Sequence, residues 1–258
     1  MNQTSEFPDL PERHVAWLDR QGAPRLAYCR SPGRSPGTLF LGGFASDMTG
    51  TKATALEAAT RNAGRAFLRF DYRGHGQSAG RFEDATVGDW LADALAVFDQ
   101  LTEGPQILVG SSMGGWIALM IAVARPDRVK ALVGVAAAPD FTQRLVRERL
   151  TDAERETLAR DGVVHQPSQY GPPTPFTRAL LEEGSRHLML DRPIPFAGKV
   201  RLLHGQRDPD VPWRLSLEVA ERLEAADVRV VLIKDGDHRL SRPEDIALLT
   251  RTVEELAS

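Results

Sequence analysis

Short apolar runs alternate with amphipathic stretches along the chain. Six mainly apolar runs have the length of β-strands, and they lie at 38–41, 66–72, 107–109, 130–135, 200–203 and 228–233. Between them, apolar residues recur at helical spacing, as at Trp90, Val97 and Leu101. Strands that alternate with helices predict an α/β fold with a parallel sheet covered by helices on both faces. Two extended segments, 14–19 and 25–30, come first and predict an antiparallel hairpin, which makes the sheet mixed.

The pattern changes between the fourth and the fifth apolar run. From 140 to 196 the chain carries charged helical segments and the proline-rich stretch 166–175, with no strand pattern. We therefore expect a helical cap at 140–196, inserted into an α/β core that is formed by 12–139 and 197–258.

The third apolar run ends at Gly110-Ser111-Ser112-Met113-Gly114, directly before a strongly apolar helix. A serine in a sharp strand-to-helix turn, with glycines two residues before and after it, is the pattern of a nucleophile elbow. Ser112 fits this frame, because Gly110 and Gly114 stand at those two positions, whereas Ser111 has no glycine at either. A Cβ would clash in so tight a turn. Ser112 is therefore the predicted nucleophile, at a helix N-terminus that stabilises an oxyanion.

Two later strands supply an acid and a histidine. The fifth apolar run leads into a loop that contains Asp208, and the sixth leads into a loop that contains His238. Serine, acid and histidine at the ends of successive strands suit a catalytic triad in the order Ser112, Asp208, His238. Asp210 competes for the role of the acid in the same loop. In this hypothesis His238 takes the proton of Ser112, and Asp208 orients the imidazole.

An oxyanion hole needs two backbone donors beside the nucleophile. One predicted donor is the N–H of Met113, which follows Ser112. The other is the N–H of Phe44, in the loop after the first apolar run, where Gly42 and Gly43 allow the backbone to approach a substrate closely.

Other polar residues are assigned structural roles. His75 is expected to shape the turn after Asp71, and His204 is expected to support the loop of Asp208. The sequence holds no phosphate-binding glycine motif and no cluster with metal-ligand spacing, so neither a cofactor nor a metal is expected.

Composition narrows the class of protein. The chain has 258 residues, of which 42% are hydrophobic, and its formal net charge of −3 gives no reason to expect a nucleic-acid partner. Cys29 is the single cysteine, so no intrachain disulfide can form. No run of eighteen apolar residues predicts a membrane span. Because residues 1–9 are polar and acidic, unlike a secretory or transit peptide, the predicted location is cytoplasmic.

Taken together, these motifs resemble the α/β-hydrolase superfamily. The resemblance is carried by Gly42-Gly43-Phe44, by Phe70-Asp71-Tyr72-Arg73-Gly74-His75-Gly76-Gln77-Ser78, by the elbow, by His204-Gly205 with Asp208, and by Asp237-His238. Within the superfamily, Gly50-Thr51-Lys52-Ala53, Val211-Pro212-Trp213 and Asp237-His238-Arg239 look like a group of mitochondrial α/β-hydrolase-domain enzymes. That group acts as palmitoyl-protein thioesterases and acyl-glucuronide esterases. The likeness is weakest over 140–196, the segment that shapes the substrate pocket in this fold.

The resemblance implies a serine hydrolase that cleaves esters or thioesters of small molecules or acylated proteins through an acyl-enzyme. A general carboxylesterase for small acyl groups is the first alternative. A carbon–carbon bond hydrolase and a non-catalytic binding protein of the same fold are the others.

Overall fold

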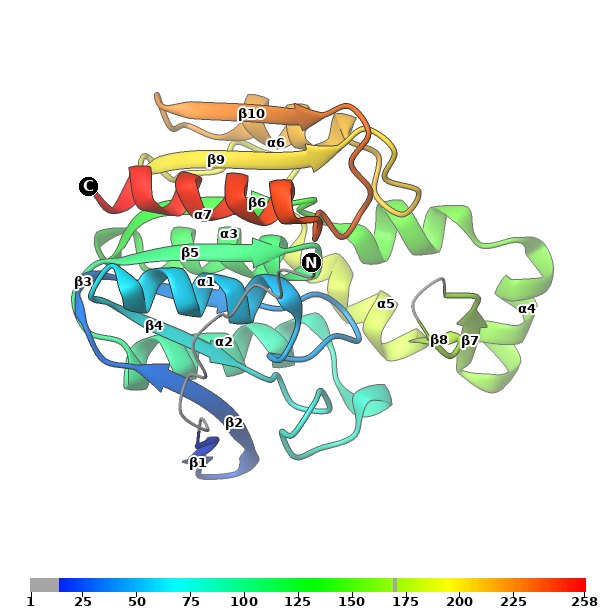
Figure 1. The fold of residues 1–258 in the computed structure, drawn as a ribbon. Coiled ribbons are helices and arrows are strands. Elements are labelled where there is room, and N and C mark those ends of the chain that lie inside the picture. The colour runs from blue at the N-terminus through cyan, green and yellow to red at the C-terminus, as the bar shows by residue number, and fades with distance from the viewer. Residues whose placement is uncertain (1–13, 169–170) are drawn as a thin grey trace, which may run out of the picture.

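A computed structural model describes residues 14–168 and 171–258, which build an eight-stranded sheet flanked by helices (Figure 1). The strands lie in the order β1-β2-β4-β3-β5-β6-β9-β10. Their bounds are β1 Ala16–Arg20, β2 Ala23–Ser31, β3 Arg34–Leu41, β4 Arg65–Phe70, β5 Gln106–Ser111, β6 Val129–Val135, β9 Lys199–Gly205 and β10 Val228–Ile233. Strand β2 pairs antiparallel with β1 and β4, and all pairings from β4 to β10 are parallel. The predicted mixed, mostly parallel sheet with an N-terminal hairpin is confirmed.

Helices cover both faces of the sheet. Helices α1 (Thr51–Asn62) and α7 (Pro243–Ala257) pack on one face, and α2 (Val87–Leu101), α3 (Met113–Ala124) and α6 (Arg214–Arg222) pack on the other (Figure 1). Side chains alternate between the two faces along a strand, and helices bury both faces, so the central strands are apolar throughout. In β5, Ile107 and Val109 join the core under α1 and α7, while Leu108 joins the core under α2 and α3. Two 3₁₀ turns, η1 (Phe82–Asp84) and η2 (Pro126–Arg128), complete this part.

Residues 140–196, here called the insertion, leave the sheet after β6 and return to it before β9, although β6 and β9 are neighbours in the sheet. Its elements stand together at one end of the sheet (Figure 1). They are η3 (Thr142–Val146), η4 (Arg147–Arg149), α4 (Asp152–Asp161), β7 (Val163–Gln166), β8 (Thr174–Thr177), α5 (Arg178–Gly184) and η5 (Ser185–His187).

The insertion is not wholly helical, contrary to the sequence-based expectation. Strands β7 and β8 form a separate antiparallel pair in which His165 lies opposite Pro175. A four-residue strand that contains a proline lacks one ladder donor and shows little alternation, so its sequence has no clear strand pattern. Residues 169–170 of the insertion and residues 12–13 of the expected core lie outside the described residues.

Asp140 closes the base of the insertion. One oxygen of its carboxyl group accepts the N–H of Met189 at 2.9 Å, and the other accepts the N–H of Leu190 at 3.0 Å. Asp140 is buried, and its backbone has a φ of 59°, a conformation that aspartate tolerates better than most residues. The first and last turns of the insertion are therefore joined by a pair of buried hydrogen bonds.

Within 14–168 and 171–258, no helix combines the length and the apolar character that crossing a membrane requires.

Replacing Asp140 by alanine is expected to loosen the insertion. Two buried N–H groups would lose their acceptor, which lowers the free energy of unfolding by about 2–4 kcal/mol. Urea unfolding measures this change, and limited proteolysis reports whether the insertion is cut first. Asp191→Ala is the matched control, because Asp191 is exposed in the same segment. Equal stability of the two variants would contradict the assigned role of Asp140.

Candidate active site

Ser112 occupies the turn between β5 and α3. Its backbone angles are φ 53° and ψ −119°, a strained combination for a residue with a side chain. Hydrogen bonds on both sides hold this conformation: the N–H of Ser112 donates to the carbonyl of Val135 at 2.9 Å, and its own carbonyl accepts from Gly115 and Ala138 at 2.9 and 3.1 Å. The strain is thus supported by the neighbouring strand β6 and by the helix that follows.

The two elbow glycines are required by close backbone contacts. A Cβ placed on Gly110 would lie 2.2 Å from the carbonyl oxygen of Gly114. A Cβ on Gly114 would lie 2.1 Å from the carbonyl oxygen of Leu41 and 2.5 Å from that of Gly42. Helix α3 therefore begins directly against the loop that leaves β3, and side chains at either position would force these backbones apart.

The loop after β3 borders Ser112, as the two predicted oxyanion donors require. A Cβ on Gly43 would come within 3.4 Å of the Cβ of Ser112, so Phe44 follows a residue that contacts the serine. Met113, on the other side, is the first residue of α3 and is buried. Phe44 and Met113 thus belong to the two backbone segments that flank Ser112.

Asp208 lies in the loop after β9 with its side chain fully buried. Oδ1 accepts the N–H groups of Asp210 and Val211 at 2.9 and 2.8 Å. Oδ2 accepts from His204 Nε2 at 3.1 Å and from His238 Nδ1 at 2.7 Å. Burial alone would raise the pKa of this carboxyl group, but the hydrogen bonds from His204 and His238 outweigh it and hold the pKa of Asp208 well below its usual range. Asp208 is therefore a permanent anion that faces the imidazole.

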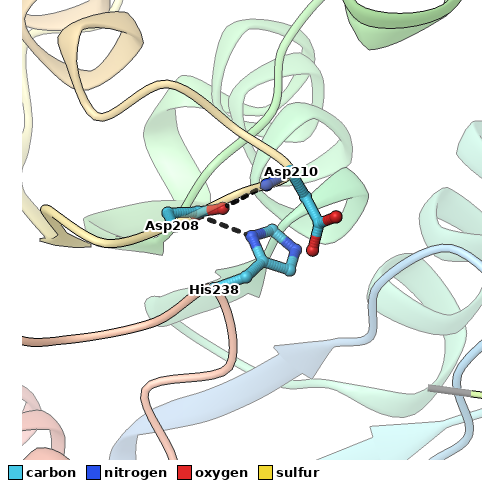
Figure 2. Close-up of side chains that lie close together, drawn as sticks. All are labelled: Asp208, Asp210 and His238. Atoms are coloured by element: carbon cyan, nitrogen blue, oxygen red, sulfur yellow. Dashed lines mark hydrogen bonds and ion pairs between the residues drawn. The ribbon is translucent and has the colours of Figure 1, made fainter. Parts of the chain in front are cut away.

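His238 is brought to Asp208 by close packing of two loops. A Cβ on Gly205, at the end of β9, would lie 2.2 Å from the carbonyl of Gly236, in the loop after β10. Because His238 donates its Nδ1 proton to Asp208, the neutral ring carries its lone pair on Nε2 (Figure 2). This tautomer gives the ring a free proton acceptor, which is what a general base needs.

Asp210, the competing acid, has a different position. Its carboxyl group extends beside the His238 ring, while Asp208 meets the ring at Nδ1 (Figure 2). Ligand atoms of Asp208, Asp210 and His238 lie within 4.8 Å of one another, a spacing that a metal could use. Asp208 already accepts four hydrogen bonds, however, so its lone pairs are committed to N–H donors. This donor set suits an acid that orients a histidine better than a metal ligand.

Three polar residues support the loops of the site from behind. The Nε2–H of His204 donates to Asp208 and to the carbonyl of Val211, and its Nδ1 accepts from Ser216 at 2.7 Å. Lys52 of α1 donates to the carbonyl of Arg239, next to His238, and burial followed by the charge of Arg239 lowers the pKa of Lys52 to about 8.

The third supporting residue, His75, does more than shape its own turn. Its Nε2 accepts the N–H of Ala45 at 3.2 Å, and its Nδ1–H donates to the carbonyl of Arg73 at 3.1 Å. Burial lowers the pKa of His75 to about 4, so the ring is neutral near pH 7. No sequence pattern signals the contact with Ala45, because the partner is a backbone N–H group thirty positions away.

Aromatic rings surround the side chain of Phe44. The ring of Phe44 is stacked on that of Phe176, in β8 of the insertion, with centroids 5.3 Å apart. It also contacts Phe82, Trp90 and Phe141, with centroid distances of 4.9, 5.5 and 5.4 Å. The loop beside Ser112 therefore has an apolar side chain that links the core to the insertion.

Comparison with known proteins agrees with this architecture. The model of the alpha/beta hydrolase family matches residues 10–247. The chain belongs to this family. It is 43% identical over 244 residues to "Palmitoyl-protein thioesterase ABHD10, mitochondrial" of Bos taurus, an alignment that covers 94% of this chain and 79% of the relative. The protein of the same name from Mus musculus is also 43% identical, with 94% of this chain and 82% of the relative covered.

Two solved structures of similar sequence have the same fold. "Alpha/beta hydrolase domain-containing protein 10 from mouse" superposes with a TM-score of 0.88 at 42% identity, covering 94% of this chain and 98% of that chain. A putative hydrolase from Agrobacterium vitis S4 superposes with a TM-score of 0.90 at 41% identity, covering 96% and 99%. The predicted fold class and the predicted resemblance are confirmed, and the protein is a hydrolase of this family.

The predicted cytoplasmic location is wrong. The relatives from Bos taurus, Mus musculus and Homo sapiens carry names that place them in the mitochondrion. The prediction rested on the polar, acidic composition of residues 1–9. Targeting signals are addresses that receptors read, so the folded hydrolase unit and its site carry no information on location.

Alanine at Gly110 or Gly114 is expected to destabilise the whole protein. Each new Cβ would overlap backbone atoms that cannot move independently, which lowers the free energy of unfolding by about 3 kcal/mol or more. Thermal and urea unfolding measure the loss. Gly171→Ala is the matched control, because a Cβ there meets nothing within 4 Å. Wild-type stability in Gly114→Ala would contradict the proposed contact with Leu41.

The burial of neutral His75 predicts a loss of stability in acid. The pKa of His75 is about 4 in the folded protein and about 6.5 in the unfolded chain, so below pH 6.5 the unfolded state binds the proton first. The free energy of unfolding should therefore fall by about 3 kcal/mol from pH 6.5 to pH 4. Urea unfolding at pH 7 and pH 4.5 tests this, with His75→Gln as the variant that lacks the titrating group. An equal loss in both proteins would assign the acid sensitivity to other groups.

Proposed function

We propose that Ser112, His238 and Asp208 form the catalytic triad of a thioesterase, with the backbone N–H groups of Phe44 and Met113 as the oxyanion hole. The observation that best supports this proposal is the hydrogen bond of 2.7 Å from His238 Nδ1 to Asp208, because it leaves Nε2 of His238 as the free base. The strained elbow around Ser112 and the contact of Gly43 with this serine also support the proposal.

The proposed reaction uses these residues in turn. Ser112 Oγ attacks the acyl carbon while His238 Nε2 takes the hydroxyl proton, and the negative charge moves to the carbonyl oxygen. The N–H groups of Phe44 and Met113 stabilise this oxyanion, and the helix dipole of α3 adds to their effect. When the tetrahedral intermediate collapses, the bond to the leaving group breaks and the imidazolium returns its proton to that group. Water, activated by His238, then attacks the acyl-enzyme and frees both the acid and Ser112.

Asp208 has two effects in this sequence. Its anion holds His238 in the tautomer with the proton on Nδ1, and it stabilises the imidazolium that forms when Nε2 takes up a proton. The low pKa of Asp208 keeps the carboxylate charged throughout. Asp208 is preferred to Asp210 because the hydrogen bond to Nδ1 comes from Asp208.

The substrate class proposed is a long-chain acyl thioester, including acylated proteins. The relatives that are 43% identical bear the name palmitoyl-protein thioesterase. The rings of Phe44, Phe141 and Phe176 offer apolar surroundings beside the loop of the oxyanion hole, and an acyl chain gains about 0.8 kcal/mol for each methylene that leaves water. We assign residues 140–196 the role of a cap that supplies part of these surroundings.

Ser112→Ala is expected to lower kcat for palmitoyl-CoA by about 10³-fold to 10⁶-fold, because the nucleophile is lost. Asp208→Asn should lower kcat by about 10⁴-fold, since the amide no longer fixes the tautomer. Thiol release measures both rates, and a matched series of p-nitrophenyl esters compares acetate with palmitate.

Controls separate the proposed residues from their neighbours. Ser111→Ala removes the adjacent hydroxyl and should retain activity, and a fluorophosphonate probe should label wild type and Ser111→Ala but not Ser112→Ala. Asp210→Asn should be far more active than Asp208→Asn. If Asp210→Asn were the inactive variant, the acid would be reassigned. If wild type hydrolysed no ester or thioester and the probe left Ser112 unlabelled, the catalytic proposal would fail.

A further inference from the structure

Side chains of the segment 69–78 form hydrogen bonds to the loop after β3 at two points, Ala45 and Met48. His75 accepts the N–H of Ala45, as described above. Asp71 Oδ1 accepts the N–H of Met48 at 2.6 Å, and Arg69 donates to the carbonyl of Met48 at 2.7 Å. All three side chains are buried. These are directional bonds to the backbone, so they fix where the loop runs and which way its peptide groups face.

The backbone next to Phe44 requires such support. Ala45 has a φ of 54°, a strained conformation for a residue with a Cβ. The N–H that His75 accepts belongs to the peptide bond that joins Phe44 to Ala45. The ring of His75 thus holds the peptide plane directly after the proposed oxyanion donor, at the point where the chain is strained.

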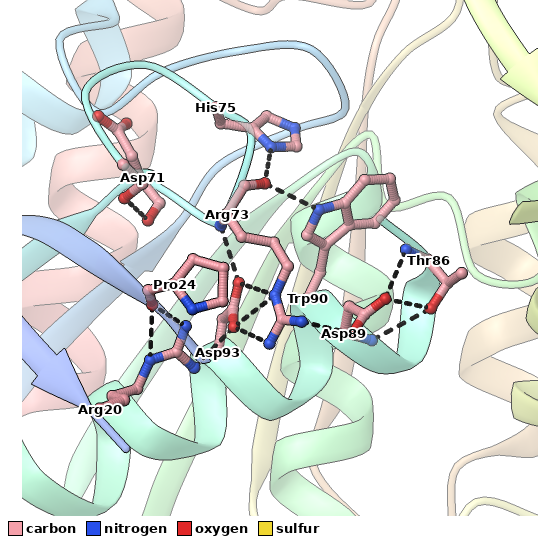
Figure 3. Close-up of polar contacts among 10 residues, drawn as sticks. Arg20, Pro24, Asp71, Arg73, His75, Thr86, Asp89, Trp90 and Asp93 are labelled. Atoms are coloured by element: carbon pink, nitrogen blue, oxygen red, sulfur yellow. Dashed lines mark hydrogen bonds and ion pairs between the residues drawn. The ribbon is translucent and has the colours of Figure 1, made fainter. Parts of the chain in front are cut away.

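The orientation of His75 is itself fixed by a buried network. The carbonyl of Arg73 accepts from His75 Nδ1 at 3.1 Å and from Trp90 Nε1 at 3.3 Å (Figure 3). Arg73 is held in turn by Asp93 of α2, which accepts its backbone N–H at 2.8 Å and its guanidinium at 2.7 Å. Asp93 is fully buried and also pairs with Arg20. The ring of His75 is packed edge-on against Trp90, with centroids 5.3 Å apart.

This network selects one protonation state. With the single proton on Nδ1, Nε2 is an acceptor for Ala45; a second proton on Nε2 would place two N–H donors against each other. Asp93 is the charged group that acts on the ring from α2, and the Arg73 guanidinium that pairs with it is the neighbouring cation. Phe82 and Tyr72, the other ring neighbours, carry no charge near pH 7.

We propose that neutral His75 is a positioning residue for the hydrolytic reaction, because it holds the Phe44–Ala45 peptide and through it the oxyanion donor of Phe44. The inference rests on the proposed function. It gives the segment 69–78 a role in the chemistry without any contact of His75 with the substrate. The oxyanion donor stabilises charge that develops only in the transition state. Loss of its positioning should therefore lower kcat rather than raise KM.

A matched pair of variants tests the hydrogen bond itself. Gln and Met have similar length, but only the glutamine carboxamide offers an oxygen that accepts the N–H of Ala45. We expect His75→Met to lower kcat about 10-fold to 100-fold, with KM within about threefold of wild type, because a misplaced oxyanion donor is less damaging than a deleted one. His75→Gln should recover most of this loss. His75→Phe, which keeps an aromatic ring without an acceptor, should follow His75→Met.

A second readout excludes a merely structural effect. A long-chain trifluoromethyl ketone forms a tetrahedral adduct whose oxyanion needs the same donors, so His75→Met should weaken its inhibition by the same factor as kcat. His14→Phe, at an exposed histidine outside the insertion, is the control and should match wild type in all assays. Melting temperatures verify that each variant is folded; if His75→Met does not fold, the comparison of His75→Phe with His75→Gln decides.

The outcomes distinguish this inference from the proposed function. If the folded Met and Gln variants share the same kcat and the same inhibitor affinity, the positioning role is overturned. A change confined to KM would overturn it as well. Activity that is lost in Ser112→Ala yet unaltered in His75→Met would leave the triad in place and remove only the role of His75. An inactive wild type would overturn the function on which the inference rests.

Discussion

The close backbone contact between the first turn of α3 and the loop after β3 is the constraint on which the candidate active site depends. Gly114 lies against the carbonyls of Leu41 and Gly42, at distances that leave no room for a Cβ. This contact sets the turn of Ser112 beside the loop of Phe44 before any side chain contributes. The two backbone segments that flank Ser112 are therefore placed by main-chain packing that leaves no void between them.

Asp208 and His238, the proposed acid and base, are placed by a second contact of the same kind. Gly205 meets the carbonyl of Gly236, so the loops after β9 and β10 touch through their backbones, and Asp208 and His238 extend from these loops. Burial would favour a protonated Asp208. Four N–H groups donate to its carboxylate, however, and their effect outweighs burial and keeps the pKa of Asp208 low. A buried anion whose lone pairs are all committed has little freedom to rotate. The hydrogen bond from Nδ1 to this fixed carboxylate restricts the orientation of the His238 imidazole in turn.

The sequence predicts those features that local patterns encode. Apolar runs locate the strands, and chain position at strand ends locates Ser112, Asp208 and His238; the structure then brings Asp208 and His238 into contact. Contacts between a side chain and a distant backbone group escape such reasoning, since any residue supplies the N–H group. Asp140 meets Met189 across 49 positions in this way.

Short strands are the other weak point of sequence patterns. Strand β8 has four residues, one of them proline, and its partner β7 is equally short. Alternation over so few residues cannot be distinguished from an irregular segment. The β7–β8 pair is specified by its packing, where Val164 and Phe176 are buried, rather than by its own pattern.

The loop of Phe44 is held in two physically different ways, and the difference suits its proposed task. On the side of the sheet, His75 and Asp71 bind the backbone with directional hydrogen bonds, which fix the geometry of the N–H groups. On the side of the insertion, the ring of Phe44 packs against Phe141 and Phe176 through apolar contacts, which tolerate rearrangement. An acyl chain can replace ring contacts of this kind without loss of a hydrogen bond. In the proposed function, an apolar substrate would therefore lie on one side of the loop while the proposed oxyanion donor stays in place on the other.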